Sequence, residues 1–172
     1  MNMDNINLLI TCLEIIYFIL PAYIANLSGL AFGGTTPLDM GKNFLDKRQI
    51  IGNGVTWKGF IFGTISGTFV GIVQGVISGN IISGFTIGFL LSFGALLGDA
   101  AGSFIKRRLN IDRGRPAPIL DQLDFIAGAL ILASLFVEIS LTTVVIAAII
   151  TLILHLLSNI IAYLLNIKDV WY

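Results

Sequence analysis

The sequence has few charged residues, one histidine and one cysteine. Only 12% of its 172 residues are charged, about half of the roughly 25% that is usual in soluble domains. So few charges cannot cover the surface of a domain of this size in water, which excludes a soluble enzyme, a nucleic-acid-binding domain and a disordered protein. The single cysteine, Cys12, excludes an intramolecular disulfide and a cysteine-based zinc site. We therefore expect no nucleic-acid partner.

The chain has long apolar runs in place of charge. Hydrophobic residues make up 56% of it, and the mean hydropathy is +0.92. A transmembrane helix needs about 20 mostly apolar residues, and five stretches meet this need, at about residues 8–32, 59–77, 81–104, 123–139 and 141–165. The sequence predicts an all-α integral membrane protein with one membrane domain over residues 1–172. Two long loops, at about 33–58 and 105–122, and two short turns join the five transmembrane helices.

All ten basic residues fall on one side of this arrangement. The two long loops contain nine of them, namely Lys42, Lys47, Arg48, Lys58, Lys106, Arg107, Arg108, Arg113 and Arg115, and Lys168 follows the last helix. The turns at 78–80 and 138–140 contain neither lysine nor arginine. By the positive-inside rule the long loops and the C-terminus are cytoplasmic and the N-terminus lies outside. We predict a multi-pass protein of the cell membrane whose active site faces the cytoplasm.

Glycine recurs at every fourth position of the second predicted helix, from Gly59 to Gly79, and again at Gly94, Gly98 and Gly102 in the third. Such ridges allow helix backbones to approach closely in lipid. The pattern predicts tight helix packing and leaves open whether it operates within one chain or in a homodimer.

The last predicted helix carries a polar face within its apolar sequence. His155 is followed one turn later by Ser158 and Asn159. Polar residues inside a membrane span mark a functional site by default, but they also hydrogen-bond neighbouring helices together. Both interpretations remain open from the sequence.

Acidic and basic residues converge around the second long loop. Asp99, Ser103 and Lys106 fall at positions i, i+4 and i+7, on one face of a helix. Asp121 and Asp124 follow at the start of the next helix. Three carboxylates without a nearby histidine or cysteine indicate hard oxygen ligation, and hence Mg²⁺. Beside so many basic residues they predict phosphoryl or nucleotidyl transfer onto a lipid; the other interpretation is that the arginines only anchor the chain to anionic lipid.

Four stretches resemble the archaeal CDP-archaeol synthase family: P-L-D-M-G-K at 37–42, G-N-G-V-T-W-K-G at 52–59, G-D-A-A-G-S-F-I-K-R at 98–107 and P-I-L-D-Q-L-D-F at 118–125. The last two are also similar to the signature of bacterial phosphatidate cytidylyltransferases, whose aspartates bind catalytic metals. The resemblance covers almost the whole chain. It implies transfer of a cytidylyl group from CTP to the isoprenoid ether-linked lipid 2,3-bis-O-(geranylgeranyl)-sn-glycerol 1-phosphate, with release of pyrophosphate.

The resemblance also implies roles for single residues. Asp99, Asp121 and Asp124 should hold Mg²⁺ and, with Lys106, carry out catalysis. Ser103, Lys106 and Arg107 should face phosphates. The residues expected to hold the nucleotide are Asp39, Lys42, Arg48, Thr56 and Lys58. The chain has Val55 where the family pattern leads us to expect a lysine, and Lys42 or Lys58 could take its place.

A small transporter or channel is the alternative hypothesis. It would use Asp99 and His155 as residues of a membrane pathway. It does not account for motif-rich loops on one side only, and the five predicted spans show no inverted repeat.

Overall fold

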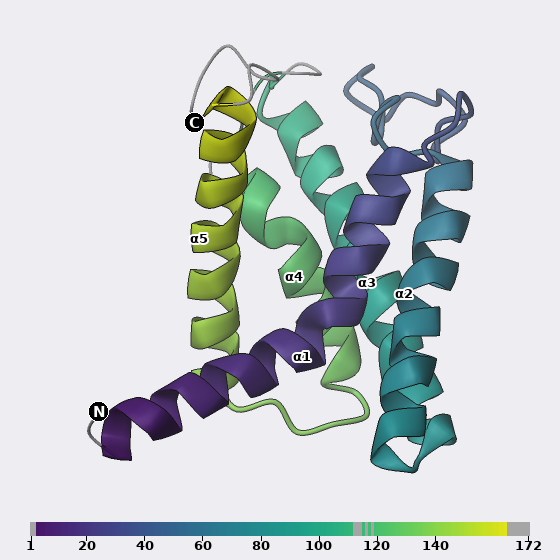
Figure 1. Ribbon diagram of the computed structural model, residues 1–172. Helices are drawn as coiled ribbons and strands as arrows, with labels where there is room; N and C mark the ends of the chain where they lie inside the picture. Colours follow the sequence, from purple (N-terminus) through teal and green to yellow (C-terminus); the bar gives the residue numbers. More distant parts are fainter. Residues whose placement is uncertain (1–2, 112–114, 116, 118, 165–172) are drawn as a thin grey trace.

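A computed structural model describes residues 3–111, 115, 117 and 119–164. Within these residues the chain forms five helices, and no β-strand: α1 (Met3–Ala31), α2 (Trp57–Ser78), α3 (Ile81–Arg108), α4 (Leu120–Ala133) and α5 (Leu141–Leu164). Successive helices run in opposite directions, so the two long loops and the end of α5 lie at one end of the bundle (Figure 1). The start of α1 lies at the other end. Arg113, Lys168 and residue 165, the predicted end of the last helix, lie outside the described residues.

Four of the described helices, namely α1, α2, α3 and α5, are long and apolar enough to cross a membrane. With 14 residues, α4 is only about 21 Å long, and it ends at Ala133. The prediction of a helix over 123–139 is therefore wrong at its C-terminal end. The apolar residues Leu135 and Phe136 suggested a longer helix, but they form a turn in which the Phe136 N–H donates to the Ala133 carbonyl (2.9 Å).

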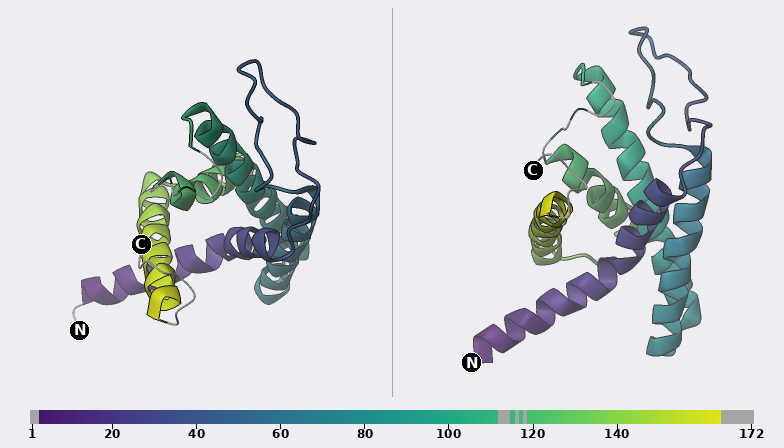
Figure 2. Two further views of the ribbon diagram at one scale, coloured as in Figure 1. Left: turned by 90° about the horizontal axis from the view of Figure 1, so that it is seen from above. Right: turned by 45° about the horizontal axis from the view of Figure 1, so that its top comes forward.

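Helix α1 bends near its midpoint, and its first half leans away from the other helices (Figures 1 and 2). Pro21 lies inside the helix and has no N–H, so the Tyr17 carbonyl loses its helical partner. Gln74 of α2 replaces that partner, with its Nε2 donating to the Tyr17 carbonyl at 2.6 Å. The hydroxyl of Ser92 in α3 donates to the Pro21 carbonyl at 3.4 Å. Gln74 thus satisfies the orphaned carbonyl at the bend, whereas the Ser92 hydroxyl makes its shorter bond, 2.6 Å, to the Gly88 carbonyl of its own helix.

The glycine ridges pack helices together within this one chain. A Cβ added to Gly59 or Gly63 would collide with the backbone of α1, and one added to Gly71 would collide with Gly88 of α3. On α3, Gly94 and Gly98 meet the backbone of α4 in the same way. The prediction of tight packing is confirmed, and this face of α3 holds α4 close to Asp99.

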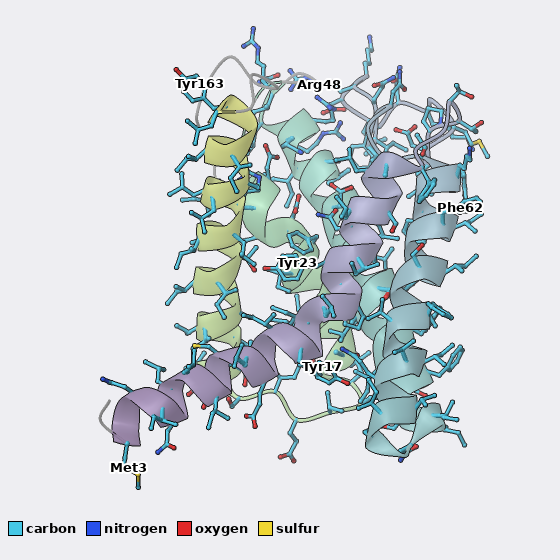
Figure 3. All side chains as sticks on the ribbon, in the orientation of Figure 1. Met3, Tyr17, Tyr23, Arg48, Phe62 and Tyr163 are labelled. Carbon is cyan, nitrogen blue, oxygen red and sulfur yellow. The ribbon has the colours of Figure 1, made fainter. Side chains whose placement is uncertain are left out.

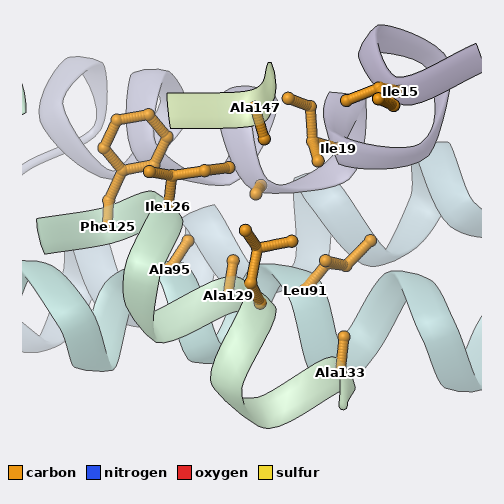
Figure 4. Packing of buried hydrophobic residues seen from close by; sticks show 11 residues of the cluster. Ile15, Ile19, Leu91, Ala95, Phe125, Ile126, Ala129, Ala133 and Ala147 are labelled. Atoms are coloured by element: carbon orange, nitrogen blue, oxygen red, sulfur yellow. The ribbon is translucent and has the colours of Figure 1, made fainter. Parts of the chain in front are cut away.

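A core of small and branched apolar residues lies between α1, α3, α4 and α5. Ile19, Leu91, Ala129 and Ala147 are completely buried in it, and Figure 4 shows them meeting from the four helices. Burial of each large side chain contributes roughly 1.5–3 kcal/mol in water; in lipid the contribution comes mainly from close contact. This core fixes α4 at the centre of the bundle, with its first turn toward the loops.

Candidate active site at the loop end of the bundle

A cavity of about 650 Å³ lies between the loop-end halves of α1 and α5, the start of α2, and the adjoining parts of α3 and α4. Its polar lining comes from four helices and from the cap residue before α2, and comprises Asp99, Asp121, Thr56, Tyr23, Asn26, Thr151, His155 and Ser158. Leucine and isoleucine side chains of α1 and α5 complete the wall. The cavity therefore joins ionic and apolar surfaces at one end of a membrane bundle.

An ion pair closes the charged side of this cavity. The Lys106 ammonium lies 2.7 Å from Oδ1 of Asp121, while Oδ2 of Asp121 accepts the Ala117 N–H at 2.8 Å. The Asp99 carboxylate is attracted to Lys106 and repelled by Asp121. Lys106 does not line the cavity itself. It acts there through Asp121, whose carboxylate it holds at the cavity wall.

Asp124 lies one turn further along α4, pressed against the glycine ridge of α3. A Cβ at Gly102 would collide with its carboxylate, so only glycine lets Asp124 lie there. Oδ1 of Asp124 accepts the Phe125 N–H at 2.7 Å. Oδ2 is buried and has no hydrogen-bond partner among the described residues. A buried carboxylate oxygen without a partner is costly, and a cation is the kind of ligand that would satisfy it.

The chemistry of these three carboxylates suits Mg²⁺, but the side chains do not form a complete coordination shell. In the part of the chain that the structure describes, no three side chains of His, Cys, Asp and Glu gather into a metal-binding group. Mg²⁺ usually takes one or two carboxylates and completes its shell with water and substrate phosphates. Asp99 and Asp121 on the cavity wall meet that requirement, and Asp124, outside the lining, adds an unpartnered Oδ2 beside Gly102.

Asp39 organises the first loop instead of lining the cavity. Its Oδ2 accepts the N–H groups of Ile51 and Gly52, both at 2.8 Å, and its Oδ1 accepts the Gly41 N–H at 2.9 Å. Burial by itself would raise the pKa of Asp39, but these hydrogen bonds outweigh it and hold the pKa below its usual value. The Asp39 carboxylate thus holds the backbone of the loop, and its contact with a nucleotide stays a prediction.

The other four predicted nucleotide residues divide between the cavity and the surface. Thr56 caps the start of α2, where its hydroxyl accepts the N–H groups of Gly59 (3.2 Å) and Gly34 (2.9 Å), and it lines the cavity. Lys42, Arg48 and Lys58 are exposed. Arg48 lies at the loop end of the bundle (Figure 3).

Two arginines attach the first loop to the end of α3. Nε of Arg107 donates to the Ile51 carbonyl (3.4 Å) and Nη1 to that of Ile111 (2.5 Å). Nη2 of Arg108 donates to the Gln49 carbonyl (2.7 Å). Arg107, predicted to face phosphate, thus contacts the backbone of the first loop and the residues after α3. Ser103, also predicted to face phosphate, is buried on α3 and is not among the residues that line the cavity.

The sequence analysis did not select Arg108. Its guanidinium lies between two rings, 5.1 Å from the centre of Phe44 and 4.8 Å from that of Phe104, and 3.0 Å from Oδ2 of Asp46. The available signal was Phe104, which precedes Arg108 by four residues and so shares its helix face, whereas Phe44 lies 64 positions away.

The polar face of α5 points into the cavity. His155 and Ser158 line it, and Asn159 is buried beside His155, with its Nδ2 at 3.3 Å from Nδ1 of the ring. The sequence missed three further lining residues: Tyr23, Asn26 and Thr151. Thr151 precedes His155 by four residues and so shares its helix face, which was the available signal.

A membrane bundle whose cavity has carboxylates on one side and an apolar wall on the other indicates a class, the multi-pass enzymes that act on lipids within the membrane. Comparison with known proteins agrees. The family model "CarS-like: CDP-archaeol synthase" matches residues 6–172. The CDP-archaeol synthase of Methanothermobacter thermautotrophicus is 67% identical over 172 residues, all of both chains. That of Methanocaldococcus jannaschii is 51% identical over 168 residues, 91% of this chain and 95% of the other.

A solved structure of an intramembrane enzyme for archaeal membrane lipids biosynthesis superposes with a TM-score of 0.80 at 44% identity. The match covers 86% of this chain and 94% of the other. The chain therefore belongs to the CDP-archaeol synthase family, a family of transferases in lipid biosynthesis. The resemblance noted in the four sequence stretches is confirmed.

Proposed function

We propose that this protein transfers a cytidylyl group from CTP to 2,3-bis-O-(geranylgeranyl)-sn-glycerol 1-phosphate, giving unsaturated CDP-archaeol and pyrophosphate for archaeal membrane phospholipids. One observation carries the proposal: in a member of this family, two aspartates backed by a lysine face a cavity whose other wall is neutral and partly apolar. That combination suits a reaction between a charged nucleotide and a membrane lipid.

The reaction joins two phosphates and needs no nucleophile from the protein. An oxygen of the lipid phosphate attacks the α-phosphorus of CTP, a new P–O–P bond forms, and the bond between the α-phosphorus and the leaving oxygen breaks. The electron pair of that bond leaves with pyrophosphate. The task of the protein is to align two anions and to offset their repulsion.

The described side chains divide this task. Lys106 supplies positive charge beside the carboxylates and keeps Asp121 at the cavity wall. Asp99, Asp121 and Asp124 are the residues that would hold Mg²⁺. When bound, Mg²⁺ supplies Lewis-acid stabilisation of negative charge on the phosphates. The loop held by Asp39 presents Thr56 at the cavity, where its backbone and hydroxyl can meet the nucleotide.

The orientation of the site follows from charge. All basic residues that the structure describes lie in the two long loops or the helix turns next to them, at the same end of the bundle as the cavity. We infer that this end is cytoplasmic, so CTP reaches the cavity from the cytoplasm while the lipid reaches it from the membrane.

Product analysis tests the proposal. Purified protein in detergent would receive CTP, Mg²⁺ and the isoprenoid glycerol phosphate, with ATP, GTP and UTP in parallel reactions, and mass spectrometry would identify the products. We expect CDP-archaeol and pyrophosphate in equal amounts, and only when CTP and the lipid are both present. A folded protein that forms no nucleotide-linked lipid would contradict the proposal and return Asp99 and His155 to the transport hypothesis.

A further inference from the structure

The two long walls of the cavity differ in chemistry. The wall formed by α3 and α4 presents the carboxylates of Asp99 and Asp121. The opposite wall, formed by α1 and α5, carries no Asp, Glu, Lys or Arg among its described lining residues. Its polar groups are hydroxyl, amide and imidazole groups. A cavity for two different anions thus has one wall suited to a metal and another suited to hydrogen bonds alone.

A contact between α1 and α5 sets the position of this second wall. The Tyr23 hydroxyl lies 2.7 Å from the hydroxyl of the buried Thr151, and the Tyr23 ring meets Phe125 edge-on at 5.3 Å between ring centres. Figure 3 shows Tyr23 pointing from α1 into the interior of the bundle. Because His155 and Ser158 follow Thr151 by four and seven residues, the same contact turns both toward the cavity.

Exposed leucines continue this wall outward. Leu27 and Leu30 of α1 and Leu154 of α5 line the cavity and keep much of their surface exposed. All three belong to helices long and apolar enough to cross a membrane, so we expect lipid chains beside them. An amphiphile bound here keeps its chains in the bilayer, whereas a nucleotide gains nothing from such a border.

The depth of the wall also suits a lipid head group. Asn26 lies five residues before the end of α1 and His155 nine residues before the end of α5, about 8 Å and 14 Å along the helix axes. Asn26 thus lies near the head-group boundary of a bilayer, whereas His155 lies deeper, at the level of Asp99, which precedes the end of α3 by the same nine residues.

We propose that Asn26, His155 and Ser158 form the subsite for the phosphoglycerol head of the isoprenoid lipid, opposite the carboxylate wall that serves the nucleotide and its metal. This inference rests on the proposed function. The amide of Asn26 and the imidazole of His155 are hydrogen-bond donors to phosphate or ether oxygens. Asn159, at 3.3 Å from the ring of His155, orients that donor. The Ser158 hydroxyl donates to the His155 carbonyl at 2.8 Å and becomes a third donor when it rotates away from that bond.

Separate binding and kinetic measurements test the subsite. Binding of the isoprenoid glycerol phosphate without CTP, and of CTP with Mg²⁺ without lipid, would be measured on the detergent-purified full chain. The variants are Asn26→Ala, His155→Gln and Ser158→Ala, and the control is Leu157→Ala, an exposed position between the two α5 residues that does not line the cavity. sn-Glycerol 1-phosphate, which lacks the chains, serves as a competitor to separate head-group from chain binding.

We expect the three variants to weaken lipid binding roughly tenfold or more each, because each loses a hydrogen bond to a charged group. KM for the lipid should rise accordingly, while CTP binding and its KM stay within about twofold of wild type. The control should match wild type. sn-Glycerol 1-phosphate should compete with the lipid for binding to wild type, but not for binding to Ser158→Ala. Variants that lose CTP binding, or that bind the lipid as wild type does, would overturn the subsite. A wild type that binds the lipid without turning over CTP would instead overturn the proposed function.

Discussion

Replacing Asp39 with asparagine tests how the first loop is held. The carboxylate accepts three backbone N–H groups, and asparagine keeps one oxygen for Gly41 while turning an NH₂ group toward the N–H groups of Ile51 and Gly52. Each lost hydrogen bond to a charged group costs about 1.5–3 kcal/mol. Because water can reach part of this loop, we expect a total loss of about 2–4 kcal/mol, which corresponds to a rise of about 30- to 1,000-fold in the equilibrium constant for loop opening.

Amide hydrogen exchange measures this opening directly. The N–H groups of Ile51 and Gly52 should exchange faster in Asp39→Asn by that factor, and the KM for CTP should rise while helix content stays the same. Asp46→Asn is the matched control, because it also removes one negative charge from this loop. Asp46 is exposed in its ion pair with Arg108, so the loss of loop stability should stay below about 1 kcal/mol. Unchanged exchange at residues 51 and 52 in Asp39→Asn would refute the reasoning.

The same carboxylate gives a pH dependence of known sign. Its pKa is lower in the folded loop than in the unfolded chain, so its stabilisation is complete above the unfolded value of about 3.9 and is lost as the pH falls through the folded value. Exchange at Gly52, corrected for intrinsic rates, should therefore accelerate in wild type only below about pH 4. Asp39→Asn should show no such step, and a wild-type step near neutral pH would contradict the assignment.

Three further substitutions test packing and docking. Gly98→Ala places a methyl group against the backbone of α4, so the free energy of unfolding should fall by about 1–3 kcal/mol and turnover should fall. The control Ala101→Leu, on the exposed face of α3, should change neither quantity. An active and stable Gly98→Ala would show that α4 can move freely. Gln74→Leu leaves the Tyr17 carbonyl without its partner and should cost about 0.6–2 kcal/mol in a detergent unfolding titration, with no effect expected from the neighbouring exposed Val73→Leu; equal stabilities would mean that the bend in α1 satisfies itself. Arg108→Ala removes the group held between Phe44 and Phe104, so the KM for CTP should rise with little change in kcat and with partial recovery in Arg108→Lys; a loss of kcat alone would contradict a positioning role.

The sequence predicted the helices well because lipid imposes a simple rule on them. Helices α2, α3 and α5 begin or end within a few residues of the predicted positions, since apolar length and flanking polar residues mark a span. The end of α4 was missed because hydropathy cannot distinguish an apolar helix from an apolar turn, and residues 134–139 are apolar enough for either. The bend in α1 depends on Gln74, a partner 57 positions away from Tyr17, which no local pattern reveals.

The charged half of the site was predictable, and the neutral half only in part. Asp99, Lys106 and Asp121 lie together because helix periodicity and a short connection bring them together. The neutral half depends on the contact between Tyr23 and Thr151, which joins the first and last helices and leaves no trace in the spacing of residues. Asp39 shows a different limit: a carboxylate beside glycines suits nucleotide binding and backbone binding equally well, and the three N–H groups that it accepts come from residues up to 13 positions away.

The most direct test of the account compares wild type with Asp99→Asn in a pyrophosphate-release assay containing CTP, the isoprenoid glycerol phosphate and Mg²⁺. The substitution keeps the size of the side chain and removes the charge that faces the cavity. The account predicts that release in wild type requires all three components and that Asp99→Asn loses at least about a thousandfold in kcat, while its unfolding midpoint and insertion match wild type. Substantial turnover by a folded Asp99→Asn, or release by wild type without the lipid, would contradict it.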